Sequence, residues 1–411
     1  MSSYKPFRCI SIDLFSQRKW NEATSSDEGF YVVLWWRTVP LGDFFHKAGK
    51  ALSQEIFETR VCNAVLPSLR SYAKDESLTC SDMSSVISSC ASFVPVYDNL
   101  PNEADASLVI CTKDRAESLR TCLQSIASLL CKPKEIIVVD NATKDDSTKR
   151  VVSEFRDVVY VREDRPGLDI ARNTGAKAAS RPIVIYTDDD TLLHPHWIYH
   201  VMRTFDDPKV VAMTGLVLAH ELKTEAQWIF ERFWPFNRGY VDRRYDEAYF
   251  RKTLPSGTPV WNIGAGANMA FRKSTFSKSG YFDERLDVGA AGCNGDSEIW
   301  YRILAGGDAI HYNPRAVVSH FHREAMSKLQ SQIFSYMRGF TAAVLIQHQR
   351  FGHKGNLRHL FLELPKYYCF LMVRGFPRYR GRFSTIFSEM RGMFSGLIFY
   401  LKNRNKPSNI N

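Results

Sequence analysis

Short, uninterrupted apolar runs alternate with stretches of helical spacing between residues 107 and 190, and this order restricts the fold more than any other feature. Strands buried on both faces of a sheet read as continuous apolar runs. We therefore predict strands at 107–112, 135–140, 158–163 and 182–186, with helices at 116–130, 146–155 and 168–180. Strands separated by helices of about 10–15 residues indicate a mostly parallel α/β sheet flanked by helices.

The regions on either side of this segment have a different texture. The first region contains two predicted strands and a helical pattern, at 7–14, 31–36 and 44–72. A proline-containing, acidic stretch at 94–105 indicates a boundary. Later elements are predicted as strands at 210–217 and 309–317 and as helices at 225–236, 297–305 and beyond 326. The expected organisation is an N-terminal α+β accessory region (1–100), a catalytic domain (101–325) and a basic, helical C-terminal region (326–411).

Composition and cysteine usage indicate an ordinary globular protein, with 45% hydrophobic and 24% charged residues. The nine cysteines include no CxxC pair, which fits reduced thiols in a cytosol better than a disulfide framework. The start, MSSYKPFRC, has no charged segment followed by an apolar one, and no run approaches the roughly 18 apolar residues of a spanning helix. A cytoplasmic location is the expectation.

Positive charge is concentrated near the end of the chain. The net charge is +10, and residues 351–411 carry eleven Lys/Arg against two acids. Nucleic-acid binders more often carry such charge on the folded body, so no nucleic-acid partner is expected. Basic amphipathic helices contact anionic membranes, and the stretch 367–400 mixes apolar residues with Arg374, Arg378, Arg380, Arg382 and Arg391. We expect peripheral contact with the inner face of a membrane; the alternative is a solvated helical extension packed on the catalytic domain.

Polar side chains follow each of the four predicted strands. In open α/β sheets, ligands bind beyond the carboxyl ends of the strands. The residues at these ends are Thr112, Lys113, Asp114 and Arg115, then Asp140 and Asn141, then 163–167, then Asp188, Asp189 and Asp190. No GxGxxG follows the first strand and no GxxxxGKS/T occurs, which disfavours a dinucleotide-binding fold and a P-loop.

The three consecutive aspartates are the most unusual of these groups. Clustered carboxylates repel one another, and a buried one is costly unless it is paired or bound to a cation. Mg²⁺ and Mn²⁺ prefer oxygen ligands and typically join one or two carboxylates to substrate phosphates. Taken alone, the stretch is also compatible with a solvated loop that caps a helix before Leu192.

Six motifs occur in a fixed order along the chain. They are SLVICTKDR from Ser107, EIIVVDN from Glu135, RPGLDIARNTG from Arg165, YTDDD from Tyr186, GANMAFR from Gly266 and GDSEIWYR from Gly295. Any acidic loop mimics the DxD part of this set, whereas six motifs in order are specific. The sequence resembles a family-2 glycosyltransferase of the GT-A fold over residues 107–322, about half of the chain. The resemblance implies a GT-A, Rossmann-like sheet.

The resemblance also implies a metal-dependent, inverting transfer from a nucleotide-diphosphate sugar. Mg²⁺ or Mn²⁺ would lie between the donor's diphosphate and the DxD pair of Asp188 and Asp190, of which Asp190 is the foremost candidate for direct contact. His320 and His322 are further candidate metal ligands, because two residues of a strand that are separated by one residue lie on the same face. The residues expected to bind the nucleotide sugar are Thr112, Asp114, Arg115, Asp140, Arg172, Asn173, Asp188 and Asp189.

The catalytic base is predicted in the last motif. Asp296 matches the second acid of the family's Glu-Asp pair, and such an aspartate takes the proton of the acceptor hydroxyl. The sequence departs from the pattern here, because Gly295 stands where the family often has Glu, and Glu298 follows. Glu298 is therefore the alternative base. Residues two apart lie on different sides of a helix, so we expect one of the two to face the site. Asp296 also suits a helix cap.

The acceptor is not identified by the sequence beyond a hydroxyl of a glycan or lipid-linked saccharide. The aromatic residues that suit either the core or an acceptor wall are Trp228, Phe230, Phe233, Trp234 and Phe236. Two other functions stay open. A sugar-phosphate nucleotidyltransferase usually has a Gly-rich, basic signature after its first strand, which CTKDRAES does not supply. A catalytically degenerate sugar-binding or scaffold protein is compatible with the departure at Gly295.

Overall fold

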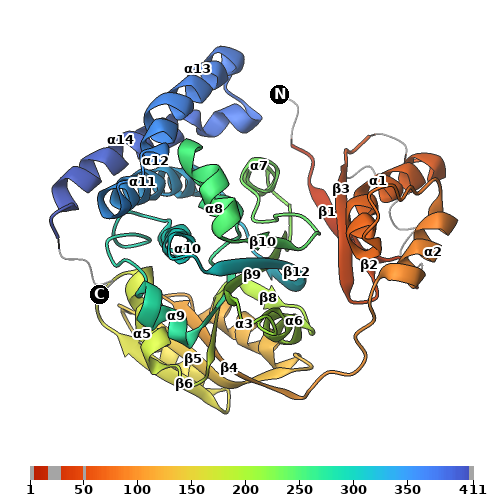
Figure 1. Cartoon of the computed structure of the whole chain (residues 1–411), viewed down its shortest axis with the longest axis horizontal. Helices are drawn as coiled ribbons and strands as arrows, with labels where there is room; N and C mark the ends of the chain where they lie inside the picture. The colour runs from red at the N-terminus through yellow and green to blue at the C-terminus, as the bar shows by residue number, and fades with distance from the viewer. Residues whose placement is uncertain (1–3, 17–28, 50–51, 407–411) are drawn as a thin grey trace.

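The structure, a computed structural model, describes residues 4–16, 29–49 and 52–406. Within these residues it contains a three-stranded sheet and a nine-stranded sheet, each with helices against it (Figure 1). The N-terminal unit lies at one side of the molecule, and the C-terminal helices lie beyond the larger sheet on the other. The predicted fold class is confirmed: a mostly parallel α/β sheet flanked by helices, with an N-terminal α+β extension and a helical C-terminal region.

The larger sheet has the strand order β10-β12-β9-β11-β7-β4-β5-β6, with β8 paired to β12. The four strands predicted first are neighbours and parallel: β4 (Glu103–Thr112), β5 (Lys132–Asn141), β6 (Val158–Glu163) and β7 (Ile183–Asp188). The others are β8 (Thr191–Leu193), β9 (Val210–Ala219), β10 (Arg243–Tyr245), β11 (Asn268–Arg272) and β12 (Ala309–His320). β11, which was not predicted, runs antiparallel between β7 and β9. Because β4 to β7 end at one edge, their terminal polar residues converge there.

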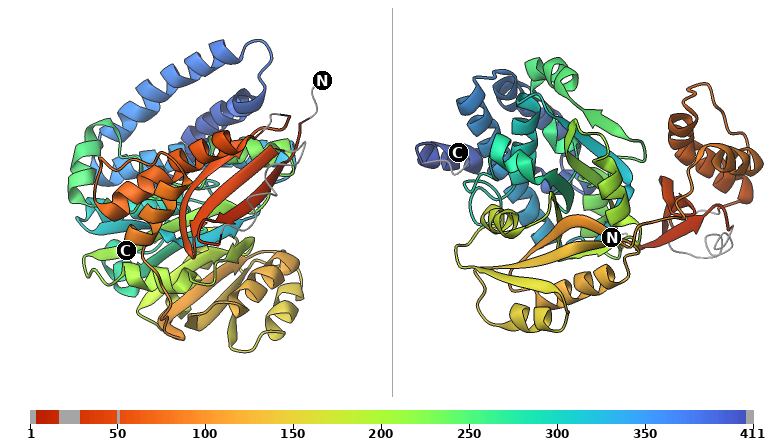
Figure 2. Two further views of the ribbon diagram at one scale, coloured as in Figure 1. Left: turned by 90° about the vertical axis from the view of Figure 1, so that its right-hand side faces the viewer. Right: turned by 60° about the horizontal axis from the view of Figure 1, so that its bottom comes forward.

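Helices cover both faces of this sheet (Figure 2). One face packs against α3 (Ala116–Ala127), α4 (Ser147–Ser153) and α6 (Trp197–Thr204). The other packs against α5 (Leu168–Ala178), α9 (Lys273–Ser279) and α10 (Gly295–Ala305). This double burial explains why the strands read as uninterrupted apolar runs.

The smaller sheet consists of β1 (Phe7–Asp13), β2 (Gly29–Trp36) and β3 (Val39–His46), with β2 in the middle. One face packs against α1 (Gln54–Ala73) and α2 (Met83–Phe93). On the opposite face, Tyr31, Val33 and Trp35 contact an apolar patch of β9 and β12 that includes Leu216 and Val317. The N-terminal unit is therefore attached to the larger sheet through a buried apolar face.

The helix predicted at 44–72 was wrong at its start. Phe44 and Phe45 pair with β2 in strand β3, and α1 begins at Gln54, where the side chain of Ser53 accepts a hydrogen bond from the backbone N–H of Ile56. β3 is the second strand of a hairpin with β2, and the helical spacing of the residues after it extended the prediction too far.

From Met326 onward the chain is helical, with α11 (Met326–Phe351), α12 (Gly355–Arg358), α13 (Leu364–Gly375) and α14 (Ile386–Asn403). α14 lies close along α11, and two glycines permit this approach. A Cβ at Gly392 or Gly396 would be only 2.4 Å from a backbone oxygen of α11. α7 (Glu225–Phe233) packs against the start of α11, and α8 (Glu247–Thr253) lies near α10. In the described part of the chain, no helix has the length and apolar character needed to cross a membrane.

Candidate active site

A cavity of about 1740 Å³ opens at the edge of the larger sheet, where the parallel strands end. Residues after β4 and β7 form one end of it, and the segment after α7, the start of α10, and α11 with the helices that follow form the rest. The predicted site residues that line this cavity are Thr112, Asp114, Arg115, Arg172, Asp188, Asp189, Asp190, Asp296 and His320. Those that do not line it are Asp140, Asn173, Glu298 and His322.

The three aspartates at the end of β7 have different surroundings. Asp189 accepts hydrogen bonds from Thr112 Oγ1 and from Arg115 Nη1, both at 2.7 Å. Arg115 also donates to Asp190 at 2.6 Å through Nη2. The Asp188 carboxylate accepts no hydrogen bond from any residue that the structure describes. Asp189 thus anchors the loop to the sheet, while Asp188 and Asp190 present carboxylate oxygens to the same point of the cavity.

Asp188, Asp190 and His320 form a group that fits a divalent cation. One ligand atom from each lies within 4.8 Å of the others, and His320 Nε2 is 3.2 Å from Asp190 Oδ1. Burial and the charge of Asp190 raise the pKa of Asp188. Burial also opposes ionisation of Asp190, but His320 and Arg115 outweigh it and hold the pKa of Asp190 well below its usual range. Two carboxylates and an imidazole suit Mn²⁺ or Mg²⁺, and a cation here would offset the repulsion between the carboxylates.

His322 lies behind His320 rather than in the cavity. Its Nδ1 is 3.1 Å from Nδ1 of His320, and its Nε2 is 2.9 Å from Glu231 Oε2 on α7. The prediction that the two histidines share a face relied on strand geometry, but β12 ends at His320, so the alternation of a strand does not reach His322. Among the described residues, the group of metal-ligating side chains contains His320 and not His322.

Arg172 of α5 links the acidic groups on the other side of the cavity. Its buried Nη1 pairs with Asp287 at 2.7 Å and with Asp169 at 3.0 Å. Asp296 lies beside the same guanidinium, since a Cβ at Gly266 would contact both Arg172 Nη2 and Asp296 Oδ2. Burial raises the pKa of Asp296, although the charge of Arg172 opposes the change. A carboxylate with a raised pKa that faces a cavity is suited to accept a proton.

The glycine that departs from the family pattern has a steric reason. A Cβ at Gly295 would lie 1.9 Å from Oδ2 of Asp169, so a side chain at this position would collide with that carboxylate. Asp169 is 1% exposed and precedes its partner Arg172 by three residues in α5. The space beside Gly295 is therefore filled by a carboxylate from another helix.

Sequence reasoning missed Asp169 and Asp287, the two partners of Arg172. A signal for Asp169 was present, because residues three apart on a helix are neighbours and oppositely charged pairs form there. No local signal pointed to Asp287, which is 115 residues from Arg172 in the sequence. The same holds for Glu231, which meets His322 only through the packing of α7 against the end of β12.

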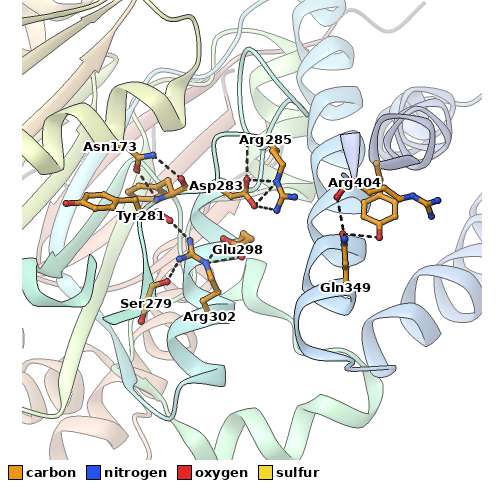
Figure 3. A network of polar contacts seen from close by, with 11 residues as sticks. Asn173, Ser279, Tyr281, Asp283, Arg285, Glu298, Arg302, Gln349 and Arg404 are labelled. Carbon is orange, nitrogen blue, oxygen red and sulfur yellow. Dashed lines mark hydrogen bonds and ion pairs between the residues drawn. The ribbon is translucent and has the colours of Figure 1, made fainter. Parts of the chain in front are cut away.

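Glu298, the alternative base, is buried away from the cavity and pairs with Arg302. Nε of Arg302 donates to both of its carboxylate oxygens, at 2.8 and 3.0 Å, and its other nitrogens donate to the backbone oxygens of Ser279 and Tyr281 (Figure 3). This fully hydrogen-bonded pair ties α10 to the segment after α9. The side of α10 that faces the cavity carries Asp296 instead, as expected for residues two apart.

Asn173 is also part of the scaffold. Its side-chain amide donates a hydrogen bond to the backbone oxygen of Phe282 and accepts one from the backbone N–H of Phe282, both at 2.9 Å (Figure 3). The side chain is 1% exposed. Asn173 therefore fixes α5 against the segment that leads to Asp287, and its neighbour Arg172 is the residue of this pair that faces the cavity.

Asp140, predicted to bind the base or ribose, is fully buried at the end of β5. Tyr160 donates a hydrogen bond of 2.8 Å to it, and burial raises its pKa. Its neighbour Asn141 lines the cavity and accepts from the backbone N–H of Gly167 at 2.9 Å. Asp114 lies at the cavity rim with a φ of 52°. Asn141 and Asp114, rather than Asp140, are the polar groups that these strand ends offer to a ligand.

Aromatic and basic side chains line the part of the cavity formed by the segment after α7 and by the C-terminal helices. Phe233, Trp234 and Phe236 line it, whereas Trp228 and Phe230 do not. The C-terminal helices add a further set: Lys328, Tyr336, Arg338, Tyr367, Arg382 and Glu389. Arg382 pairs with Glu389 at 2.5 Å and lies 5.3 Å from the centre of the Trp234 ring. The C-terminal region is thus part of the cavity wall, which its sequence did not indicate.

Known proteins with similar sequences are glycosyltransferases. The Haloferax volcanii glucosyl-dolichyl phosphate glucuronosyltransferase is 24% identical over 255 residues, which cover 58% of this chain and 76% of that protein. The Mycobacterium tuberculosis pre-mycofactocin glycosyltransferase is 23% identical over 302 residues, which cover 73% of this chain and 60% of that protein. The solved mannosyltransferase PcManGT from Pyrobaculum calidifontis, in complex with GDP-Man and Mn²⁺, has a TM-score of 0.49 and 16% identity, over 76% of this chain and 92% of that chain.

The family match is more specific than these individual relatives. Residues 107–280 match the family model described as glycosyl transferase family 2, and they contain the parallel strands and the three aspartates. The match covers somewhat less than half of the chain and includes five of the six motifs from Ser107 onward in full. The resemblance predicted from the six motifs is confirmed.

Proposed function

We propose that this enzyme transfers a sugar from a nucleotide-diphosphate donor to an acceptor hydroxyl, with inversion and with the help of Mn²⁺ or Mg²⁺. The observation that carries the proposal is the composition of one cavity. It holds the Asp188–Asp190–His320 group on one side and the Asp296 carboxylate, beside Arg172, on the other. A metal-binding group and a separate candidate base are the two functions that such a transfer requires.

In the proposed reaction, a divalent cation held by Asp188, Asp190 and His320 would neutralise the donor's diphosphate as it leaves. Arg115 fixes the orientation of Asp190, and Asn141 with Asp114 faces the nucleoside from the neighbouring strand ends. Asp296 takes the proton of the acceptor hydroxyl while that oxygen attacks the anomeric carbon from the face opposite the diphosphate. Arg172, paired with Asp169 and Asp287, lies beside Asp296, and its charge favours the ionised form of that carboxylate.

The acceptor in this proposal is a glycan or lipid-linked saccharide that occupies the aromatic end of the cavity. Aromatic side chains such as Trp234 and Tyr336 suit the apolar faces of sugars. Exposed Arg323 and Lys328 line the same region and suit an acceptor that carries phosphate. A lipid-phosphate sugar also features in the name of the Haloferax volcanii relative, glucosyl-dolichyl phosphate glucuronosyltransferase.

Peripheral contact with an anionic membrane belongs to the same proposal. α13 and α14 expose large apolar side chains at helical spacing: Phe370, Val373, Phe376, Phe387, Met390, Phe394, Ile398 and Leu401. Exposed basic residues accompany them: Lys366, Arg374, Arg378, Arg380, Arg391, Lys402 and Arg404. Arg382, which the sequence suggested as a further basic contact, is instead paired with Glu389. The nine cysteines, all unpaired, support a reducing compartment and hence the inner face.

Titration calorimetry tests the chemical part of this function. We expect UDP or GDP to bind tightly with Mn²⁺ and weakly without it, and the preferred base identifies the donor. Absence of metal-linked nucleotide binding would contradict the proposal and favour a degenerate or scaffold protein. A nucleotidyltransferase would instead release diphosphate from a nucleoside triphosphate and a sugar phosphate, which a diphosphate-release assay detects.

Co-sedimentation with vesicles tests the membrane contact. The unaltered protein should bind vesicles that contain phosphatidylglycerol and not those of phosphatidylcholine alone. Val373→Glu should reduce this binding, because Val373 is 78% exposed on the apolar stripe of α13. Val159→Glu, at an exposed apolar position of β6, is the matched control. Equal binding by both variants would contradict a membrane role for α13.

A further inference from the structure

A chain of buried polar contacts runs from α7 to the metal group. Glu231 Oε2 is 2.9 Å from His322 Nε2, and His322 Nδ1 is 3.1 Å from His320 Nδ1. His320 Nε2 then lies 3.2 Å from Asp190 Oδ1. The side chains of Glu231, His320 and His322 are each at most 9% exposed. Neither Glu231 nor His322 lines the cavity, so neither touches a substrate there.

We propose that Glu231 and His322 are positioning residues that hold His320 in the one orientation and tautomer in which it binds the metal. The inference rests on the proposed function, because it takes the Asp188–Asp190–His320 group as the metal site. It adds to that function two residues, one on α7 and one beyond β12, that act on the metal only through His320.

The positions of the protons on the two imidazole rings determine which residue donates and which accepts in each of these contacts. His320 Nε2 binds a cation only through its lone pair, so in a neutral ring the proton must be on Nδ1. That N–H points at His322 Nδ1, which must then be the acceptor. His322 therefore carries its own proton on Nε2 and donates it to Glu231. With the metal on Nε2 of His320, this order needs an acceptor at the far end, and the carboxylate of Glu231 is one.

Packing holds the two rings in place. The Phe230 ring lies 4.7 Å from the His322 ring, and the Phe236 ring lies 5.3 Å from the His320 ring, measured between centroids. Gln227, one turn before Glu231 on α7, donates to the backbone oxygen of His322 at 3.3 Å. α7 therefore supplies both the carboxylate and the contacts that keep His322 within its reach.

The test compares substitutions at His322 by their effect on Mn²⁺ affinity. Electron paramagnetic resonance of free Mn²⁺ measures binding of the metal alone, and again with UDP or GDP present. We expect His322→Leu to weaken Mn²⁺ binding about 10–100-fold, the usual effect of losing a hydrogen-bond partner of a metal ligand. His322→Asn should recover most of the affinity, because its carbonyl oxygen can accept the hydrogen bond from His320.

Two further variants distinguish the loss of the Glu231–His322 contact from a general disturbance of the structure of α7. Glu231→Leu should weaken Mn²⁺ binding in the same range as His322→Leu, whereas Glu225→Leu, at an exposed position on the same helix, should not change it. Thermal unfolding of each variant shows whether it is folded. Unchanged Mn²⁺ affinity in a folded His322→Leu protein overturns the inference, as does equal weakening by His322→Leu and His322→Asn. If the unaltered protein itself binds no Mn²⁺ with either nucleotide, the proposed function fails first.

Discussion

The two ends of the cavity differ in the part of the chain that builds them and in the side chains they carry. The proposed donor end comes from residues 112–190, at the ends of adjacent parallel strands, and its character is acidic. The proposed acceptor end comes from residues 233–238 and from helices after Met326, and its character is aromatic and basic. Parallel strands bring their ends together whatever the loops contain, so the donor end follows from the sheet itself.

The difference separates general chemistry from specificity. A diphosphate and a divalent cation require the same oxygen ligands in any donor, and short segments after strands supply them. In the proposed function, an acceptor is recognised by shape and by apolar contact in the part of the cavity that α7, α11 and α13 line together. We therefore expect substitutions at the two ends to change different kinetic parameters.

Removal of the central metal ligand should have the largest effect. We expect Asp190→Ala to lower kcat/KM by about 10⁴-fold or more, because it removes charge stabilisation of the leaving diphosphate together with donor binding. Mn²⁺-linked nucleotide binding, measured by calorimetry, should be lost as well. Asp206→Ala, at an exposed surface position, is the control. Retention of metal-linked binding in Asp190→Ala would place the metal elsewhere.

Substitution of the proposed base should affect turnover without affecting the binding of donor and metal at the other end of the cavity. We expect Asp296→Asn to lower kcat about 10²–10⁴-fold while donor and Mn²⁺ binding stay unchanged. Since burial raises the pKa of Asp296, the ionised group is unfavourable in the folded protein, and the variant should unfold at a higher temperature.

Glu298→Gln is the matched control for the base. It should destabilise the protein by about 3 kcal/mol, because it leaves Arg302 buried without a full counter-charge. The kcat of the folded fraction should be little changed. If Glu298→Gln instead abolishes turnover in a stable protein while Asp296→Asn stays active, the roles of these two residues are reversed.

Acidification should weaken both ends of the cavity. The raised pKa of Asp296 means that it becomes protonated, and ineffective as a base, as the pH falls, and below that pKa kcat should fall about tenfold per pH unit. The pKa of Asp188 is raised as well, so its protonation should weaken Mn²⁺ binding even though the lowered pKa of Asp190 keeps that residue ionised. Mn²⁺ affinity and kcat at saturating Mn²⁺, measured at the same pH values, separate the two causes; a kcat that does not change with pH would contradict the role of Asp296.

Stability has its own pH dependence, which the measurement must separate from activity. Burial lowers the pKa of His194 to about 4 and that of His200 to about 3, so these side chains are neutral in the folded protein. The unfolded chain takes up protons below about pH 6.5. The contribution of these two histidines to stability is therefore constant above that pH and falls as the pH is lowered toward the folded values. Thermal unfolding recorded at each pH identifies the range in which the loss of kcat is not unfolding.

The sequence predicted the donor end closely because its signals are local. Uninterrupted apolar runs located β4 to β7 within a few residues, and the polar residues after them include Arg115 and the three aspartates that line the cavity. Helical spacing indicated that one of the two acids of α10 faces the cavity, and the family resemblance favoured Asp296. Not every polar strand end lines the cavity, since Asp140 is fully buried and does not belong to the cavity wall.

The other features depend on contacts between distant parts of the chain. β11 is short and enters the sheet between β7 and β9 only in the folded protein. Asp287 reaches Arg172 over 115 residues, and Glu231 reaches His322 over 91. Arg382 looked like a free basic residue until α14 placed Glu389 against it. No periodicity or motif reports such pairings, because they depend on how whole elements pack.

The smallest effect is expected at the acceptor end. Trp234 lines the cavity between the loop after α7 and Arg382, whereas Trp228, six residues earlier, stacks on Phe7 of the N-terminal unit at 6.3 Å. We expect Trp234→Ala to raise the KM for the acceptor about tenfold, which corresponds to the loss of one aromatic contact, with donor KM and kcat little changed. Trp234→Phe should raise it less. Trp228→Ala should lower the unfolding temperature without changing acceptor KM. A larger acceptor effect from Trp228 than from Trp234 would move the acceptor to the N-terminal unit, none of whose described residues lines the cavity.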